Sequence, residues 1–290
     1  MNFVKDKIYS KEEAFDWCEN LAKSHYENFP VGSILVPKKM RPHFYNIYAY
    51  SRMADDLADE GDFSTSERLK NLNDFRESFL ECIKANSKPQ EPVFVALKET
   101  MSFLQLPQKP FLDLVKAFEM DTTFTEYENR EQQIFYCKHS ANPVGKLVLS
   151  LFGKSNPEND FLSDKICTAL QIVNFLQDIS VDWGKGRVYI PQSIYSSFGL
   201  EREDFHNSDK TENFRKMILS EVDFVEKMFY EGSELIHKTS GRLSLELRFV
   251  VSSGLTILGK VKELNSKLRF ERPHLKTSDK LKILKKVIQF

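Results

Sequence analysis

The chain has 290 residues, 41% of them hydrophobic, and its 41 Lys and Arg residues balance 42 Asp and Glu residues to a net charge of −1. This balance argues against a nucleic-acid-binding surface, which normally carries a basic excess. The four cysteines are far apart and form no CxxC pair, which disfavours a thiolate zinc site and favours reduced thiols. No signal-peptide-like or membrane-spanning apolar run is present, so we expect a cytoplasmic protein, soluble or peripheral at the inner membrane surface.

Amphipathic segments separated by Gly- and Pro-bearing loops make up most of the chain, and strand-like alternation is almost absent. Ser10 and Glu13 form a capping-box pattern that opens the first predicted helix, and Pro42 suits the first turn of the second. We expect helices at 10–22, 42–60, 66–86, 92–104, 110–120, 131–151 (interrupted near 142), 161–182, 212–239 and 243–270. The pattern predicts one all-α domain over residues 1–290. The 24 Phe residues indicate either a heavy core or an aromatic-walled pocket, which composition does not distinguish.

The C-terminal segment 280–290 is basic and amphipathic. Leu281, Leu284 and Ile288 share one face of a predicted helix, and Ile283 and Val287 share another. Such a helix can lie on an anionic bilayer or dock on the surface of its own protein. The second interpretation is the favoured one.

The most informative stretch is 174–182, where Asn174, Asp178 and Asp182 recur at every fourth residue. On a continuous helix each step of four turns the side chain by only about 40°, so all three share a narrow face. Amide and carboxylate oxygens of this kind suit Mg²⁺. Taken alone, however, the triplet is as consistent with a solvated acidic face.

A second acidic pattern lies upstream, where Asp55 and Asp59 are one helical turn apart and Asp56 and Glu60 point off that face. If the two helices face each other, four carboxylates converge. Their repulsion would cost several kcal/mol unless cations bridge them, so the pattern favours bound Mg²⁺ and an anionic substrate. Arg52 lies one turn before Asp55, and Lys185 and Arg187 follow Asp182. These cations suit a departing diphosphate.

At this point the sequence resembles the squalene and phytoene synthase family over about residues 25–272. Its two signatures, DxxxD and NxxxDxxxD, are met by Asp55/Asp59 and by Asn174/Asp178/Asp182. Further matches are residues 48–52 (YAYSR), Gln171 and residues 186–191 (GRVYIP). The resemblance implies an all-α isoprenoid (terpenoid) synthase fold: a single helical bundle around a deep central cavity with the acidic motifs at its mouth. It also implies two or three Mg²⁺ ions and a prenyl diphosphate substrate.

The roles implied by the resemblance are assigned residue by residue. The five motif residues would bind metal, and Arg52 and Arg187 would contact phosphate, with Lys185 near them in the loop. Arg272, in Glu271-Arg-Pro-His, would close the diphosphate pocket. Tyr48 would line the cavity near the metals, Gln171 would contact substrate, and the cavity wall would include Phe29, Val144 and Leu147. For each apolar residue, ordinary core packing is the alternative.

Three details resemble the hydroxysqualene synthase branch of the family, which serves hopanoid biosynthesis. They are 27–33 (ENFPVGS), 140–145 (SANPVG) and 174–178 (NFLQD). Gln177 stands where condensing relatives usually carry arginine, so one phosphate-side cation is missing. This suits an enzyme that binds one diphosphate rather than two. His139 aligns with a mechanistic tyrosine of squalene synthase. It would orient water or accept a proton, or else be a structural histidine.

The sequence therefore predicts Mg²⁺-dependent conversion of presqualene diphosphate to hydroxysqualene. Two alternatives remain open. One is a condensing synthase that makes presqualene diphosphate, dehydrosqualene or phytoene, and the other is a non-catalytic assembly or binding factor with the same fold. We expect no nucleic-acid partner. Peripheral membrane contact and association with other enzymes of squalene biosynthesis are both consistent with the resemblance.

Overall fold

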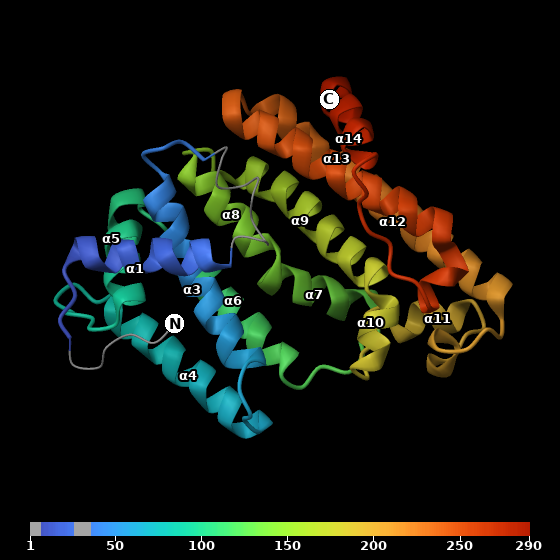
Figure 1. Cartoon of the computed structure of the whole chain (residues 1–290), viewed down its shortest axis with the longest axis horizontal. Helices are drawn as coiled ribbons and strands as arrows, with labels where there is room; N and C mark the ends of the chain where they lie inside the picture. Colours follow the sequence, from blue (N-terminus) through green and yellow to red (C-terminus); the bar gives the residue numbers. More distant parts are fainter. Residues whose placement is uncertain (1–6, 26–35) are drawn as a thin grey trace. The chain divides into compact units, whose positions relative to one another are not determined.

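The structure is a computed structural model that describes residues 7–25 and 36–290. The chain divides into two compact units, residues 1–123 with 146–155, and residues 124–145 with 156–290. Each is helical (Figure 1), and no extended strand occurs in residues 7–25 and 36–290. Glu126 and Val188 form an isolated parallel bridge. The predicted all-α class is confirmed, whereas the single domain stays a prediction.

The first unit is built from α1, α3, α4, α5 and α6, together with the C-terminal part of α8. Ser10 and Glu13 make the reciprocal capping bonds that the sequence predicted, and Ser64 and Glu67 repeat them at α4. Pro residues occupy the first turn of α3, α5 and α6. The bounds are α1 (Lys11–Ser24), α3 (Arg41–Asp59), α4 (Thr65–Cys82), α5 (Pro92–Leu104), α6 (Lys109–Asp121) and α8 (Asn142–Leu151).

An aromatic cluster fills the core of this unit. Tyr50 of α3 contacts the rings of Phe75, Phe79, Phe94 and Phe111, at centroid distances of 4.9, 5.3, 6.4 and 5.2 Å. All five rings are buried, and the Tyr50 hydroxyl donates to the Phe111 carbonyl. These phenylalanines are therefore core residues and not the wall of an aromatic pocket.

The second unit contains α7, α9 to α14 and two 3₁₀ turns. Helix α12 packs against both α9 and α13, and glycines allow the close approach. A Cβ on Gly232 would lie 3.0 Å from the Leu162 carbonyl oxygen, and one on Gly254 would lie 2.5 Å from the Phe229 ring. The bounds are α7 (Arg130–Ser140), α9 (Pro157–Gln177), α10 (Ile179–Gly184), α11 (Gln192–Ser197), η2 (Arg202–Phe205), α12 (Thr211–Lys238), α13 (Gly241–Leu264), η3 (Asn265–Arg269) and α14 (Asp279–Gln289).

Three helix predictions were wrong in extent, and the one at 66–86 ends at Cys82. The helix predicted at 161–182 is broken at Asp178, whose backbone lies at φ −101° and ψ 9°, outside the helical range. The helix predicted at 243–270 ends at Leu264 and continues as η3, because Asn265 adopts a positive φ of 42°. The interruption predicted near 142 is confirmed as the boundary between α7 and α8.

Candidate active site

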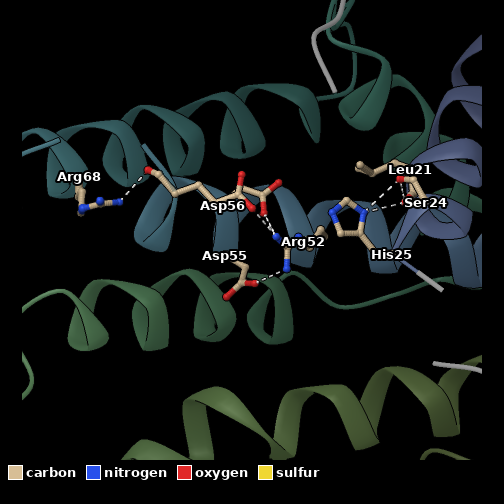
Figure 2. Close-up of polar contacts among 8 residues, drawn as sticks. Leu21, Ser24, His25, Arg52, Asp55, Asp56 and Arg68 are labelled. Atoms are coloured by element: carbon tan, nitrogen blue, oxygen red, sulfur yellow. Dashed lines mark hydrogen bonds and ion pairs between the residues drawn. The ribbon is translucent and has the colours of Figure 1, made fainter. Parts of the chain in front are cut away.

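The first acidic motif lies on the last turns of α3, where Arg52 binds three carboxylates at once. Its guanidinium nitrogens lie 3.1 Å from Asp55, 2.5 Å from Asp56 and 2.8 Å from Glu60. Figure 2 shows the guanidinium between the Asp55 and Asp56 side chains. The sequence predicted a phosphate-contacting arginine here, and the structure adds that its charge is already shared among neighbouring acids.

Burial sets the electrostatics of this motif. It raises the pKa of Asp55 to about 6, and the charges of Asp59, Asp56 and Glu60 act in the same direction, while Arg52 opposes them. Burial also raises the pKa of Asp56. Asp59 is exposed at the end of the helix. The motif therefore holds carboxylates whose ionised form is unfavourable, which is the condition that a bound cation relieves.

Sequence reasoning missed Arg68, which holds the carboxyl end of α3. Its guanidinium donates to the carbonyl oxygens of Ala58, Glu60 and Gly61, at 2.7, 2.9 and 2.7 Å. These contacts satisfy carbonyl groups at the end of the helix that carries the motif. No local pattern marks Arg68, which lies in the first turn of the next helix, α4.

The second motif spans the break between α9 and α10, yet keeps its one-turn spacing. The Asp178 amide donates to the Asn174 carbonyl at 2.9 Å, and the Asp182 amide donates to the Asp178 carbonyl at 2.8 Å. Asn174 is exposed, and Asp178 and Asp182 are partly buried. Burial raises the pKa of Asp182 to about 6, and the charge of Asp178 adds to the rise. The bent backbone thus preserves the predicted neighbours although the predicted continuous helix is absent.

A segment from much later in the chain lies against this motif. The Gln177 side-chain amide donates to the Pro273 carbonyl at 2.7 Å, and the Arg272 guanidinium binds the Asp178 carboxylate across 94 residues of sequence. Pro273 is buried. From the sequence, Arg272 was expected at the diphosphate pocket, and Gln177 was expected to leave the motif one cation short. In the structure, Gln177 binds the segment that carries the cation of Arg272.

The loop after α10 brings two more cations near Asp182. The charges of Lys185 and Arg187 lower the pKa of Asp182, opposing burial. The Arg187 amide donates to the Asp182 carbonyl at 2.9 Å. Asp182 and Arg187 line one small recess, together with the rings of Phe175 and Tyr189, which stack at a centroid distance of 4.2 Å. Lys185 is exposed.

Sequence reasoning also missed a clamp on this loop. Arg202 donates to the Gly186 carbonyl at 2.7 Å, and its guanidinium lies 5.2 Å from the ring centre of Trp183. His206 stacks on the same indole at 5.5 Å. Gly186 adopts a positive φ of 71°, which glycine accepts without strain. Arg202 therefore fixes the turn that carries Lys185 and Arg187.

The remaining predicted residues are placed as follows. His139 contacts the Phe135 carbonyl through Nδ1 at 2.8 Å, and the two rings lie 4.4 Å apart. Tyr48 and Gln171 are partly buried, and burial raises the pKa of Tyr48. Val144 is exposed, whereas Leu147 is buried in the core of the first unit. Phe29 lies outside the described residues.

Neither acidic motif is a complete metal site by itself. Across residues 7–25 and 36–290, no three His, Cys, Asp or Glu side chains gather as a metal-binding cluster. The donors at both motifs are nevertheless hard oxygens, and Asp55 and Asp182 carry raised pKa values that a cation would reverse. The residues therefore fit Mg²⁺ that takes few protein ligands and completes its shell with water and diphosphate oxygens.

Comparison with known proteins identifies the family of the chain. The squalene/phytoene synthase family model matches residues 22–279. The hydroxysqualene synthase of Sinorhizobium fredii is 32% identical over 251 residues, which cover 86% of this chain and 83% of that protein. That of Zymomonas mobilis is 38% identical over 191 residues, covering 63% of this chain and 61% of the relative's length.

Solved structures show the same fold. The squalene synthase HpnC from Alicyclobacillus acidocaldarius superposes with a TM-score of 0.82 at 36% identity, covering 88% of this chain and 95% of that one. A dehydrosqualene synthase superposes with a TM-score of 0.82 at 22% identity over 96% of each chain, which is a likeness of fold. The helical architecture, the motifs and the family match lead to one conclusion: the chain belongs to the squalene/phytoene synthase family, terpenoid synthases that act on prenyl diphosphates.

Proposed function

We propose that this protein converts presqualene diphosphate to hydroxysqualene with the help of Mg²⁺. The carbon–oxygen bond to diphosphate breaks, the cyclopropylcarbinyl cation rearranges, and water forms the new carbon–oxygen bond and releases a proton. The observation that carries the proposal is the second motif, where Asn174, Asp178 and Asp182 keep their one-turn spacing beside Arg272, Lys185 and Arg187. Two relatives named hydroxysqualene synthase, at 38% and 32% identity, support the choice of reaction.

The chain's own residues divide the work. Asp55, Asp59, Asn174, Asp178 and Asp182 would hold Mg²⁺, which when bound acts as a Lewis acid on the diphosphate. Arg52, Arg187 and Arg272 would bind phosphate oxygens, since guanidinium groups bind phosphate bidentately. To do so, each would give up part of its present contacts within the protein. Bound Mg²⁺ would favour the ionised carboxylates of Asp55 and Asp182, whose pKa values burial raises.

His139 is the proposed acceptor of the water proton. With Nδ1 donating to the Phe135 carbonyl, the neutral ring carries its acceptor lone pair on Nε2. A structural histidine would make the same Nδ1 contact, so the two roles differ only in chemistry. The variant His139→Phe should then keep diphosphate release but lose hydroxylated product in favour of alkene, whereas a structural role would lower all products together.

The condensing synthase is the second candidate, and the family match favours it as well, since the relatives include phytoene synthases at 26–30% identity. Such an enzyme binds two diphosphates and needs a cation for each. In the structure Gln177 binds Pro273, and the neighbouring Arg272 binds Asp178. Arg272 therefore supplies a cation near this motif although position 177 is a glutamine and not an arginine. The non-catalytic alternative would be expected to lose motif residues, and all five are present.

Product analysis separates the three candidates. Purified protein would be incubated with Mg²⁺ and either presqualene diphosphate or farnesyl diphosphate, and the products identified by gas chromatography and mass spectrometry. We expect hydroxysqualene from presqualene diphosphate and no product from farnesyl diphosphate. A C30 product from farnesyl diphosphate alone would support the condensing synthase, and metal-dependent binding of neither substrate would support the non-catalytic factor. Enzymes that supply presqualene diphosphate and consume hydroxysqualene would be its partners.

A further inference from the structure

Helix α14 is fixed to the second unit by one face. Ile283 and Val287 are buried where α14 packs on α13. At its first turn the buried Asp279 binds Lys260 at 2.8 Å, and near its end Arg248 of α13 donates to the Val287 carbonyl at 3.4 Å. Contacts at both ends determine which face of the helix points away from the protein. The preferred sequence interpretation, docking on the protein's own surface, is confirmed for this face.

The opposite face is apolar and exposed. Leu281, Leu284 and Ile288 retain 68%, 48% and 76% of their accessible surface. Their spacing of three and four residues places them in one stripe along the helix. Scattered exposed leucines need no explanation, but three large aliphatic side chains in one stripe on an eleven-residue helix form a contiguous apolar surface.

Lysines border this stripe on both sides. By helical rotation Lys280 lies beside Leu284, and Lys285 lies on the other side, next to Leu281. Both lysines are exposed, and neither forms an ion pair with residues 7–25 or 36–290, whereas Lys282 lies 3.8 Å from Asp279. Four lysines and one aspartate give α14 a formal charge of +3, in a chain whose net charge is −1. The helix that exposes the apolar stripe therefore also carries a net positive charge.

We propose that the outer face of α14 binds the surface of an anionic lipid bilayer. The stripe of Leu281, Leu284 and Ile288 would enter the boundary between headgroups and acyl chains, and Lys280 and Lys285 would contact lipid phosphates. A second copy of the chain fits this face less well, because pairing two such stripes would bring the bordering lysines of both copies together. Across the described residues no helix has the length and apolarity needed to cross a bilayer, so the contact would be superficial.

This contact adds a partner to the proposed function, whose substrate is a C30 lipid diphosphate that resides in membranes. It does not depend on that function, because lipid binding requires neither catalysis nor metal. The test therefore measures binding in the absence of substrate and Mg²⁺, so that a wrong reaction and a wrong surface give different failures.

The experiment is co-sedimentation of the full chain with vesicles of phosphatidylcholine alone or mixed with phosphatidylglycerol. We expect binding to the mixed vesicles, weakening with salt, and little binding to phosphatidylcholine alone. The triple variant Leu281→Gln, Leu284→Gln, Ile288→Gln should lower the partition coefficient at least about tenfold, because the apolar contribution is lost. Since these side chains are exposed and Gln is a good helix former, the variant should fold normally by circular dichroism.

One control variant and one further test variant complete the experiment. The double variant Leu69→Gln, Phe103→Gln alters exposed apolar side chains outside α14 and should bind vesicles like the parent. The double variant Lys280→Gln, Lys285→Gln should lose binding to mixed vesicles at low salt. The proposal is overturned if the triple variant binds like the parent, or if light scattering shows a dimer that the triple variant dissociates while vesicle binding is absent.

Discussion

The two acidic motifs solve the same electrostatic problem in different ways. On α3 the neutralising cation is local, because Arg52 lies within two turns of Asp55, Asp56 and Glu60 and binds all three. At the α9–α10 junction the carboxylate of Asp178 is bound by Arg272, 94 residues further along the chain. One motif is therefore assembled by a single helix, and the other needs a distant segment held in place by Gln177.

This difference has a consequence for how each motif responds to change. A local ion-pair network forms whenever its helix forms, so its loss should reduce the local stability of the carboxyl end of α3. A long-range contact depends on how a surface segment packs, so its loss should change the substrate or metal affinity of the second motif more than the stability of the fold. Four sets of variants test that contrast.

Asp178→Asn should lower turnover of presqualene diphosphate by at least about a hundredfold, because it weakens a metal ligand and breaks the contact with Arg272. The melting temperature should change little, since Asp178 is partly exposed and not part of the core. Steady-state kinetics and thermal unfolding provide the two readouts. The matched control is Asp62→Asn, an exposed aspartate beyond the first motif. Equal activity in the two variants would remove Asp178 from the mechanism.

Arg52→Gln should lower turnover by about ten- to a hundredfold and also loosen the end of α3, because three carboxylates lose their shared cation. Hydrogen exchange should increase at 52–60. The comparison variant Arg272→Gln should raise KM with little change in exchange outside 270–276. If Arg272→Gln loosened its unit as much as Arg52→Gln loosens α3, the contrast between local and long-range neutralisation would be wrong.

Gln177→Ala tests the hydrogen bond that holds the Arg272 segment. Loss of one partly buried hydrogen bond costs about 1 kcal/mol, so we expect faster hydrogen exchange at 270–276 and a severalfold rise in KM with kcat less affected. Gln90→Ala, an exposed glutamine in a loop, is the control. A Gln177→Ala variant with unchanged exchange would show that the Pro273 contact does not position this segment.

Asp182→Asn should change the stability of the fold to an extent that depends on pH. The folded pKa of Asp182 is raised to about 6, so the folded state binds its proton more tightly than the unfolded state. Its contribution to the free energy of unfolding therefore falls as pH rises from about 4 to about 6. Relative to the parent, the asparagine variant should gain stability across that interval, by at most about 3 kcal/mol.

Urea unfolding of the metal-free protein at several pH values measures this gain. The variant's relative stability should be greater at neutral pH than under acid conditions. Asp62→Asn again serves as the control, and its stability relative to the parent should not change with pH in this way. A constant difference between Asp182→Asn and the parent would contradict the raised pKa.

Sequence patterns identified what is local in this molecule. The capping box at Ser10, the bounds of α5 and the one-turn spacing of both motifs all follow from residues close together in the chain. The break at Asp178 was missed because no Gly or Pro marks it. The Gln177–Pro273 and Arg272–Asp178 contacts join segments nearly a hundred residues apart, and a pattern within one segment carries no information about them.

The family resemblance assigned residues to the candidate site that periodicity alone does not mark. It marked Arg272 as a pocket residue, which periodicity would not have done, and the structure places Arg272 on the Asp178 carboxylate. It gave no indication of Arg68 and Arg202, which bind carbonyl groups at the ends of the two motif regions. Such residues act through contacts with backbone carbonyl groups, and these contacts do not require a particular sequence pattern.

The main proposal is that each acidic motif binds Mg²⁺ together with diphosphate. A crystal structure with Mn²⁺ in place of Mg²⁺ and an unreactive diphosphate analogue tests it directly, because anomalous scattering locates each manganese ion. We predict manganese ions at both motifs, with Asp55 or Asp59 among the ligands at the first, Asn174, Asp178 or Asp182 among those at the second, and diphosphate bound at the manganese. Manganese absent from either motif, or diphosphate bound away from the manganese ions, would contradict this prediction.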